Sequence, residues 1–310
     1  MNVKSVRHPG LMIVSFLLVL CFCLPVSLQA DWRNQFDEVK IGVLSGENEK
    51  DRIRRYKMFG KYMTKALGKK VKIFTASSYA GVMQAMAADQ VEFAFYGSSS
   101  YAGAWKEMDG KIQPLLTRVT DDGSTGYYSV VVVKADSPYK TVDDLKGKTL
   151  AFGDPNSTSG YAVPYYNLKK QGYNPEKFFG SVTFSGAHET GILGVYNGQF
   201  DAACTWMTND AVGNFQRMME KKMIPEGSVR YIWKSPEITN GPFAARSNLP
   251  KDLIDDATLA LFRMASEDPK AYSEMVDKNQ IGWIAVNHNR YAWIVTMRDD
   301  IKKMKRARGN

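Results

Sequence analysis

Three consecutive hydroxyl residues, Ser157, Thr158 and Ser159, lie in the segment Phe152-Gly-Asp-Pro-Asn-Ser-Thr-Ser-Gly-Tyr161. The pattern predicts a buried strand, then a turn, then a helix from Gly160 onward. The first N–H groups of a helix lack partners within it, so these donors, the helix dipole and the hydroxyls together can surround a tetrahedral oxyanion. An ordinary N-cap explains the segment alone equally well, because no Walker-type Gly-Lys-Ser/Thr accompanies it.

Enzymatic chemistry has weaker support. Ser157 or Ser159 could form a dyad with His188, but a hydrolase also needs an orienting acid, and no Gly-x-Ser-x-Gly elbow is present. The chain has three histidines, and Cys204 is the one cysteine beyond residue 30. They show no metal-ligand spacing, so we expect neither a metal nor another cofactor, and no catalysis.

The first thirty residues predict export. Lys4 and Arg7 precede an apolar run over residues 11–24, and residues 26–30 end in a small residue, Ala30, that suits cleavage. A membrane anchor is the alternative, but the run is shorter than the roughly 20 residues that a spanning helix needs. We therefore predict a cleaved signal peptide over residues 1–30 and a periplasmic protein, either free or tethered.

Removal of the signal leaves 280 residues, with Cys204 unable to form an intrachain disulfide. This length suits two domains of about 100–150 residues. The formal charge falls from +9 to +7, because Lys4 and Arg7 leave with the signal. A basic balance suits anionic ligands, whereas the basic stretch 302–308 favours solubility or contact with the envelope surface, and nucleic acid is a poor inference for an exported chain.

Strand and helix patterns alternate along the remaining chain, which predicts an α/β fold. A second βα series, beginning near residue 149, is inserted within the first. The predicted strands are 39–44, 71–75, 91–96, 115–119, 127–134, 149–152, 182–184, 200–204 and 229–233. The predicted helices are 51–67, 79–88, 98–109, one that begins at Ser159, 189–197, 251–265 and 268–278.

Several motifs resemble the substrate-binding proteins of phosphonate and phosphite ABC importers, and the similarity extends over essentially the whole chain after residue 30. Asp154-Pro-Asn-Ser-Thr-Ser-Gly160, followed about thirty residues later by Gly186-Ala-His-Glu-Thr190, is the most specific match. Shorter matches are Val43-Leu44-Ser45, Ser78-Tyr79-Ala80-Gly81-Val82, Phe95-Tyr96-Gly97 and Trp233-Lys-Ser-Pro236.

The resemblance implies a class II periplasmic binding fold, in which two α/β lobes are joined by two crossing strands and enclose a ligand between them. It places residues 31–126 and 240–310 in one lobe and residues 127–239 in the other. It further implies an importer permease as partner, a small phosphorus oxyanion as ligand, and a monomer.

Site roles also follow from the resemblance. Ser157, Thr158 and Ser159 match the ligands of the phosphonate oxygens, and His188 matches a ligand-binding histidine, although a buried structural histidine is the alternative for a lone His. Two aromatic site residues of the opposite lobe match Tyr79 and Tyr96. For these tyrosines the alternative is an ordinary core position.

One departure bears on the ligand. Relatives that recognise aminoalkylphosphonates place carboxylates in two segments that here correspond to residues 205–210 and 238–242, which offer only Asp210, out of register with the match. Trp206 presents a flat apolar wall in the first segment, and Asn240 is a candidate in the second. Asp201 could reach the site, with a cap or a salt bridge as its alternative. We therefore expect phosphite, methylphosphonate or another compact oxyanion.

A periplasmic sensor is the alternative function. The same fold could bind an oxyanion such as phosphate or arsenite and regulate a membrane signalling kinase. Cys204 supports this alternative, because arsenite is thiophilic, but a lone cysteine more often fills a small buried position.

Overall fold

The computed structural model describes residue 1 and residues 31–306. Apart from Met1, the predicted signal peptide and its cleavage site near Ala30 lie outside the described residues, as do residues 307–310. Among the helices in the described part, none has both the length and the apolar character needed to cross a bilayer.

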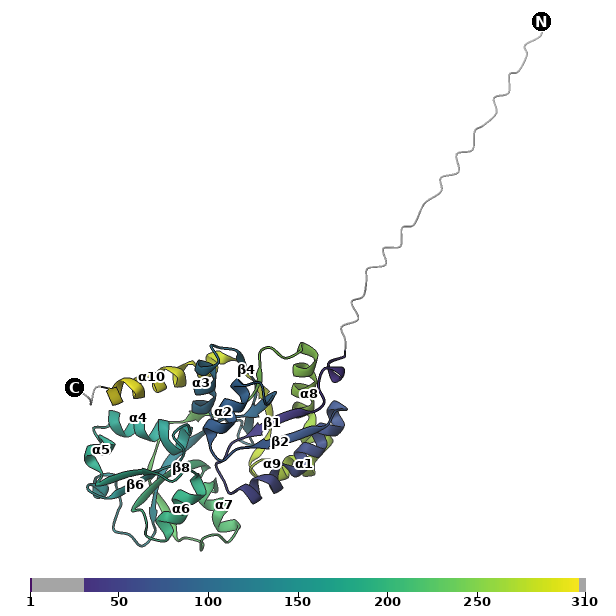
Figure 1. Ribbon diagram of the computed structural model, residues 1–310. Helices are drawn as coiled ribbons and strands as arrows, with labels where there is room; N and C mark the ends of the chain where they lie inside the picture. Colours follow the sequence, from purple (N-terminus) through teal and green to yellow (C-terminus); the bar gives the residue numbers. More distant parts are fainter. Residues whose placement is uncertain (2–30, 307–310) are drawn as a thin grey trace. The chain divides into compact units, whose positions relative to one another are not determined.

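The first sheet has the strand order β13-β4-β12-β3-β1-β2, and helices cover both of its faces (Figure 1). Its strands β1, β2 and β3 pair in parallel, whereas β12 and β13 pair antiparallel with their neighbours. The strands are β1 (Val39–Val43), β2 (Val71–Thr75), β3 (Phe93–Phe95), β4 (Ile112–Thr120), β12 (Pro242–Arg246) and β13 (Gln280–Ala285). The helices are η1 (Trp32–Asn34), α1 (Glu49–Leu67), α2 (Tyr79–Ala87), α3 (Ser98–Glu107), α8 (Lys251–Glu267) and α9 (Pro269–Met275).

The second sheet has the order β10-β5-β8-β6-β7, with β11 paired to β5 and β9 paired to β8. Its strands are β5 (Gly126–Lys134), β6 (Thr149–Phe152), β7 (Ser181–Phe184), β8 (Ala202–Asn209), β9 (Val212–Gly213), β10 (Val229–Lys234) and β11 (Ile238–Thr239). Its helices are η2 (Asp143–Leu145), the π-helical turn η3 (Thr158–Ala162), α4 (Val163–Lys170), α5 (Pro175–Phe178), α6 (His188–Tyr196) and α7 (Asn214–Glu220).

The chain passes between the two sheets twice. It leaves the first sheet after β4 and enters the second in β5, and it returns between β11, which pairs with β5, and β12, which pairs with β4. Each sheet with its helices forms one lobe, here lobe 1 for the first sheet and lobe 2 for the second. The numerical lobe boundaries given above remain a prediction.

Two segments near the C-terminus differ from the sequence-based expectation. The helix predicted over 268–278 ends at Met275, and the chain then forms the edge strand β13. After η4 (His288–Tyr291), the helix α10 (Ala292–Arg306) buries Ile294, Met297 and Ile301. The basic residues that follow, Lys302, Lys303, Lys305 and Arg306, are exposed, as a solvated helix end predicts.

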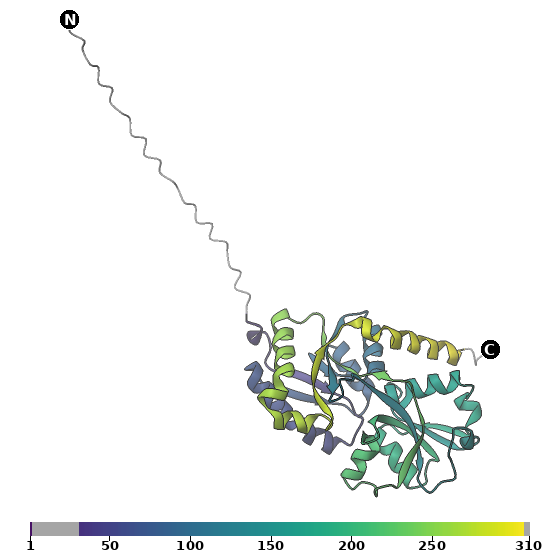
Figure 2. The same cartoon turned by 180° about the vertical axis from the view of Figure 1, so that it is seen from behind.

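Helix α10 contacts both lobes (Figure 2). In lobe 1, Arg298 donates a hydrogen bond from Nη1 to Ser99 Oγ at 2.9 Å. The same guanidinium donates from Nη2 to Asn156 Oδ1 of lobe 2 at 3.2 Å. Lys305 lies over the ring of Tyr161 in lobe 2 at 4.8 Å. The helix thus packs across the junction of the lobes.

The second crossing is sterically tight at Gly241, and this predicts a sensitive position. A Cβ atom at Gly241 would lie 1.8 Å from the carbonyl oxygen of Tyr96, so Gly241→Ala must displace one of the two backbones. We expect this substitution to lower the free energy of unfolding by about 3 kcal/mol, the upper range for overpacking. Urea denaturation measures the change.

Gly282→Ala is the matched control, because a Cβ there would meet only Val119 Cγ1 at 3.9 Å, an ordinary contact. Equal stability of the two variants would contradict the close approach of the crossing segment to Tyr96.

Candidate functional site

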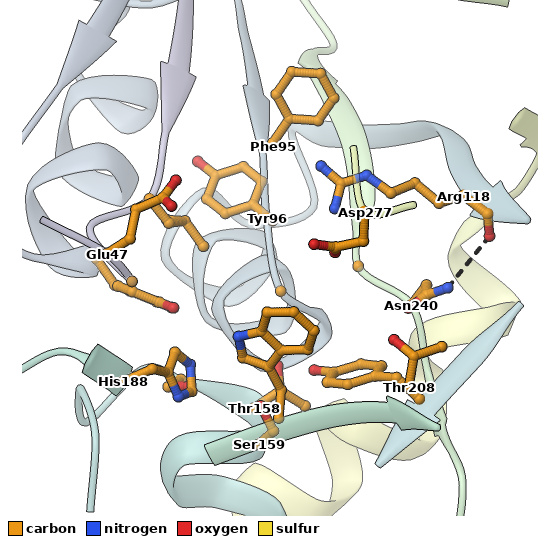
Figure 3. A pocket seen from close by; sticks show the side chains of 18 of the residues that line it. Glu47, Phe95, Tyr96, Arg118, Thr158, Ser159, His188, Thr208, Asn240 and Asp277 are labelled. Atoms are coloured by element: carbon orange, nitrogen blue, oxygen red, sulfur yellow. Dashed lines mark hydrogen bonds between the residues drawn. The ribbon is translucent and has the colours of Figure 1, made fainter. Parts of the chain in front are cut away.

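A cavity of about 200 Å³ lies between the lobes, where the carboxyl ends of several strands meet. Hydroxyl groups and His188 line one side of it, and Arg118 and Asp277 lie on the other side (Figure 3). Ligands of open α/β sheets bind at such strand ends. The cavity is therefore the candidate ligand site.

The turn after β6 brings the three predicted hydroxyl residues to the cavity. Ser157 is the N-cap of the following π-helical turn, and its Oγ accepts a hydrogen bond from Gly160 N–H at 3.0 Å. Ser157, Thr158 and Ser159 are all buried and all line the cavity. Ser157 thus caps the helix start while the whole cluster faces the cavity.

Tyr127, which the sequence analysis did not single out, lies beside this cluster at the start of β5. Burial raises the pKa of Tyr127, and hydrogen bonds with the side chains of Thr158 and Ser159 offset part of that increase. Ser129, two residues along the same strand, donates from Oγ to the Ser159 carbonyl at 2.7 Å. Strand β5 thus both holds the turn and adds a phenolic hydroxyl to it.

His188 begins α6 and lies between two hydroxyls. Its Nε2 is 3.3 Å from Ser157 Oγ, and its Nδ1 is 3.1 Å from Thr205 Oγ1. Burial, and secondarily the charge of Arg217, lowers the pKa of His188 to about 4. The imidazole is therefore neutral at pH 7, with one nitrogen as donor and the other as acceptor.

The two predicted tyrosines are placed differently. Tyr79 lines the cavity, and its hydroxyl interacts with the side chain of Ser157. Tyr96 also borders the cavity, but its ring packs in the hydrophobic core, its hydroxyl has no hydrogen-bond partner, and burial together with the charge of Glu107 raises its pKa. Tyr127, rather than Tyr96, thus supplies the phenol beside Thr158.

Trp206 and Asn240 line the cavity as expected, but Asp201 does not. Asp201 lies before β8, where Oδ2 accepts from Thr149 N–H at 2.8 Å and Oδ1 accepts from the Tyr139 hydroxyl at 2.7 Å. Both carboxylate oxygens of Asp201 are engaged in these contacts. The expectation that Asp201 reaches the site is therefore wrong, and the alternative of a capping role agrees with its hydrogen bond from Thr149 N–H.

Cys204 points into the hydrophobic core from β8 and does not line the cavity. Burial raises the pKa of its thiol, which keeps it protonated. It is therefore not placed to bind a thiophilic ion in this site.

The other side of the cavity carries charged groups that sequence reasoning did not identify. Arg55 and Glu47 come from lobe 1 and are paired at 3.5 Å. Arg217 of lobe 2 pairs across the cleft with Asp277 of lobe 1 at 3.3 Å. No local pattern could reveal the second pair, because Arg217 and Asp277 lie 60 residues apart and Arg217 is on α7, a helix that was not predicted.

The starts of three lobe 1 helices receive hydrogen-bond acceptors from lobe 2. Free N–H groups and the helix dipole make such starts partly positive. Glu189 accepts from the N-cap residue of α1 rather than from its own helix. The pairs are Asn48 N–H with Glu189 Oε2 at 2.8 Å, Tyr79 N–H with Asp154 Oδ2 at 3.1 Å, and Ser99 N–H with Thr158 Oγ1 at 2.8 Å.

This arrangement suits binding of an oxyanion. Neutral donors from both lobes surround one side of the cavity, while the Ser157–His188 pair has no orienting acid, since Thr205 occupies the other imidazole nitrogen. Within residues 31–306, no three His, Cys, Asp or Glu side chains are grouped to hold a metal ion. Fold and site together define a two-lobe periplasmic binding protein.

The chain belongs to the family of periplasmic substrate-binding proteins of phosphonate ABC transporters, whose model matches residues 41–306. The phosphonates-binding periplasmic protein of Escherichia coli K12 is 35% identical over 252 residues, or 79% of this chain and 70% of the relative. The phosphate-import protein PhnD of Mycolicibacterium smegmatis is 30% identical over 232 residues, or 71% and 69% of the two chains.

A solved binding-protein component of an ABC phosphonate transporter from Pseudomonas aeruginosa has the same fold, with a TM-score of 0.74 and 27% identity over 84% of this chain and 85% of that one. The predicted family and fold class are thereby confirmed. The family consists of transport proteins that bind a solute for a membrane permease, which favours the importer function over the sensor alternative.

The buried neutral state of His188 predicts a pH dependence of stability. Its folded pKa of about 4 lies below the ordinary value of about 6.5, so between these values the unfolded chain binds a proton that the folded chain excludes. Stability therefore falls as the pH decreases through this range, by on the order of 3 kcal/mol in the limit. Urea denaturation of ligand-free protein from about pH 7 to about pH 4.5 measures it.

As the pH decreases over the same range, the free energy of unfolding of His188→Gln should fall less than that of the wild type. His288→Gln is the control, because the other described histidine is only partly buried and should leave most of the slope in place. Parallel slopes for the wild type and His188→Gln would mean that His188 does not impose this dependence.

Proposed function

We propose that this chain captures a compact phosphorus oxyanion, such as phosphite or methylphosphonate, between its lobes and delivers it to an ABC permease without catalysing a reaction. The observation that carries the proposal is the cluster of Tyr127, Thr158, Ser159 and neutral His188, which offers several convergent donors at the strand ends. Relatives named for phosphonates and for phosphate both handle phosphorus oxyanions, which supports this ligand class.

Neutral side chains in the cavity favour a compact ligand over an aminoalkyl one. Thr208 and Asn240 line the cavity in the two segments where a carboxylate was sought. The acids that do reach it, Glu47 and Asp277, are already paired with arginines. A ligand ammonium would lose water without gaining a free counter-charge, which is costly in a closed site.

We infer that residues 1–30 are removed near Ala30 and that the exported chain acts as a monomer in the periplasm, with no nucleic-acid partner. The arsenite version of a sensor has lost its support, because Cys204 lies in the core rather than at the cavity.

Substitution of the hydroxyl cluster tests the site. Ser159→Ala and Tyr127→Phe each remove one hydroxyl beside the proposed anion position, and each should weaken methylphosphonate or phosphite binding by about 1–3 kcal/mol, the range for hydrogen bonds to charged groups. This corresponds to about 5-fold to 150-fold in Kd. Isothermal titration calorimetry at fixed pH and salt measures it.

Ser137→Ala and Tyr231→Phe are matched controls, because the Ser137 hydroxyl donates to the Lys134 carbonyl and the Tyr231 hydroxyl donates to Asp210, and none of these residues lines the cavity. Wild-type protein that binds none of phosphite, methylphosphonate and phosphate would refute the proposed function. Sustained phosphate release from an ester, abolished by Ser157→Ala, would instead support a hydrolase.

A further inference from the structure

Arg118 is a cation in the wall of the cavity that has no hydrogen-bonded acid partner among the described residues. It extends from β4 on the side opposite Thr158 and Ser159, and its guanidinium faces the cavity (Figure 3). Among the residues that the structure describes, none accepts a hydrogen bond from this guanidinium, and no carboxylate lies within 4.0 Å of it. Its charge still acts on Asp277 at longer range, since Arg55, Arg217 and then Arg118 lower the pKa of that carboxyl against the effect of burial. The residue is only partly buried, so its free donors are accessible from the cavity.

Two aromatic side chains hold the guanidinium in place. Its Cζ lies 5.8 Å from the ring centroid of Phe95 and 5.6 Å from that of Trp283, both within the range of cation–π contacts. Phe95 and Trp283 are themselves buried. Arg118 is therefore positioned by apolar contacts that leave its hydrogen-bonding capacity unused.

The other cations that line the cavity already have carboxylate partners. Arg55 pairs with Glu47 at 3.5 Å and with Asp277 at 3.7 Å, and Arg217 pairs with Asp277 at 3.3 Å. Three arginines thus face two acids in the cavity lining, and Arg118 accounts for the excess positive charge.

The cavity has room beyond a compact oxyanion. Its volume of about 200 Å³ equals the share of at least six water molecules at roughly 30 Å³ each. An anionic PO₃ group held by the hydroxyl cluster would leave the side with Arg118 to the ligand's substituent. Guanidinium binds a carboxylate through two parallel hydrogen bonds, so a substituent that ends in a carboxylate fits its chemistry.

We propose that Arg118 selects the ligand by the charge of its substituent, favouring phosphonates that carry a carboxylate over neutral ones and disfavouring those that carry an ammonium. This inference rests on the proposed function, because it assumes that the phosphonate group occupies the hydroxyl cluster. It adds a ligand class, the carboxylated phosphonates, to the compact oxyanions.

Three ligands of similar size test the ranking in wild-type protein: phosphonoacetate, ethylphosphonate and 2-aminoethylphosphonate. In calorimetry at fixed pH and salt, phosphonoacetate should bind at least about tenfold more tightly than 2-aminoethylphosphonate, with ethylphosphonate between them. Any other order overturns the inference without recourse to a variant.

Arg118→Gln then tests whether this residue is responsible. It should reduce the ratio of phosphonoacetate to 2-aminoethylphosphonate affinity by at least about tenfold, and it should also reduce the ratio of phosphonoacetate to methylphosphonate affinity. Arg263→Gln makes the same charge change on the exposed face of α8 and should leave the ratio unaltered. Arg118→Met keeps the apolar stem between the two aromatic rings and repeats the test if the Gln variant is unstable.

Equal losses of affinity for all four ligands in both Arg118 variants would mean that Arg118 serves the oxyanion itself or the fold. An unchanged ratio of phosphonoacetate to 2-aminoethylphosphonate affinity would mean that Arg118 does not select the substituent. Either result overturns the inference. Failure of wild-type protein to bind methylphosphonate and phosphite would refute the proposed function, and the inference with it. Normal methylphosphonate binding with no dependence on substituent charge would refute the inference alone.

Discussion

Three helix starts on one lobe need hydrogen-bond acceptors, and the other lobe supplies them. The first N–H groups of α1, α2 and α3 lack partners within their helices, and Glu189, Asp154 and Thr158 of lobe 2 accept hydrogen bonds from them across the cleft. Each contact replaces water with a side chain that the partly positive helix start favours. The closed arrangement thus has direct stabilisation of its own, and a bound anion adds to it instead of supplying all of it.

The two sides of the cavity differ in the charge of the groups that line them. One side is neutral, because burial keeps His188 uncharged and its companions are hydroxyls, so it can hold an anion only by hydrogen bonds and helix-start dipoles. The other side is ionic, with Arg217 paired to Asp277 across the cleft. The PO₃ group of a ligand can therefore be recognised by hydrogen-bond geometry, and its substituent by charge. The ionic side also explains why residues of a cross-cleft ion pair line the ligand cavity.

Local patterns predicted most of the strands and helices, though not α7, β12, β13 or α10. They also predicted the hydroxyl turn, because a strand, a turn and a helix start are encoded within ten residues around Ser157. They could not predict which tyrosine faces the cavity. Phe95 at the end of β3 and Tyr96 directly after it both border the cavity, but their rings pack in two different core clusters. The phenol comes instead from Tyr127, on a strand of the other sheet. Arg118 was equally hidden, since its setting depends on Trp283 of β13, an edge strand that follows α9 after a short break.

Ligand-dependent closure is the central claim, and small-angle X-ray scattering tests it most directly. The account predicts a smaller radius of gyration at saturating methylphosphonate than without ligand, because an anion held by Tyr79 and by Ser159 and His188 joins the two lobes and shifts the population toward the closed form. Binding verified by calorimetry, with scattering profiles that are identical in the presence and absence of ligand, would contradict it.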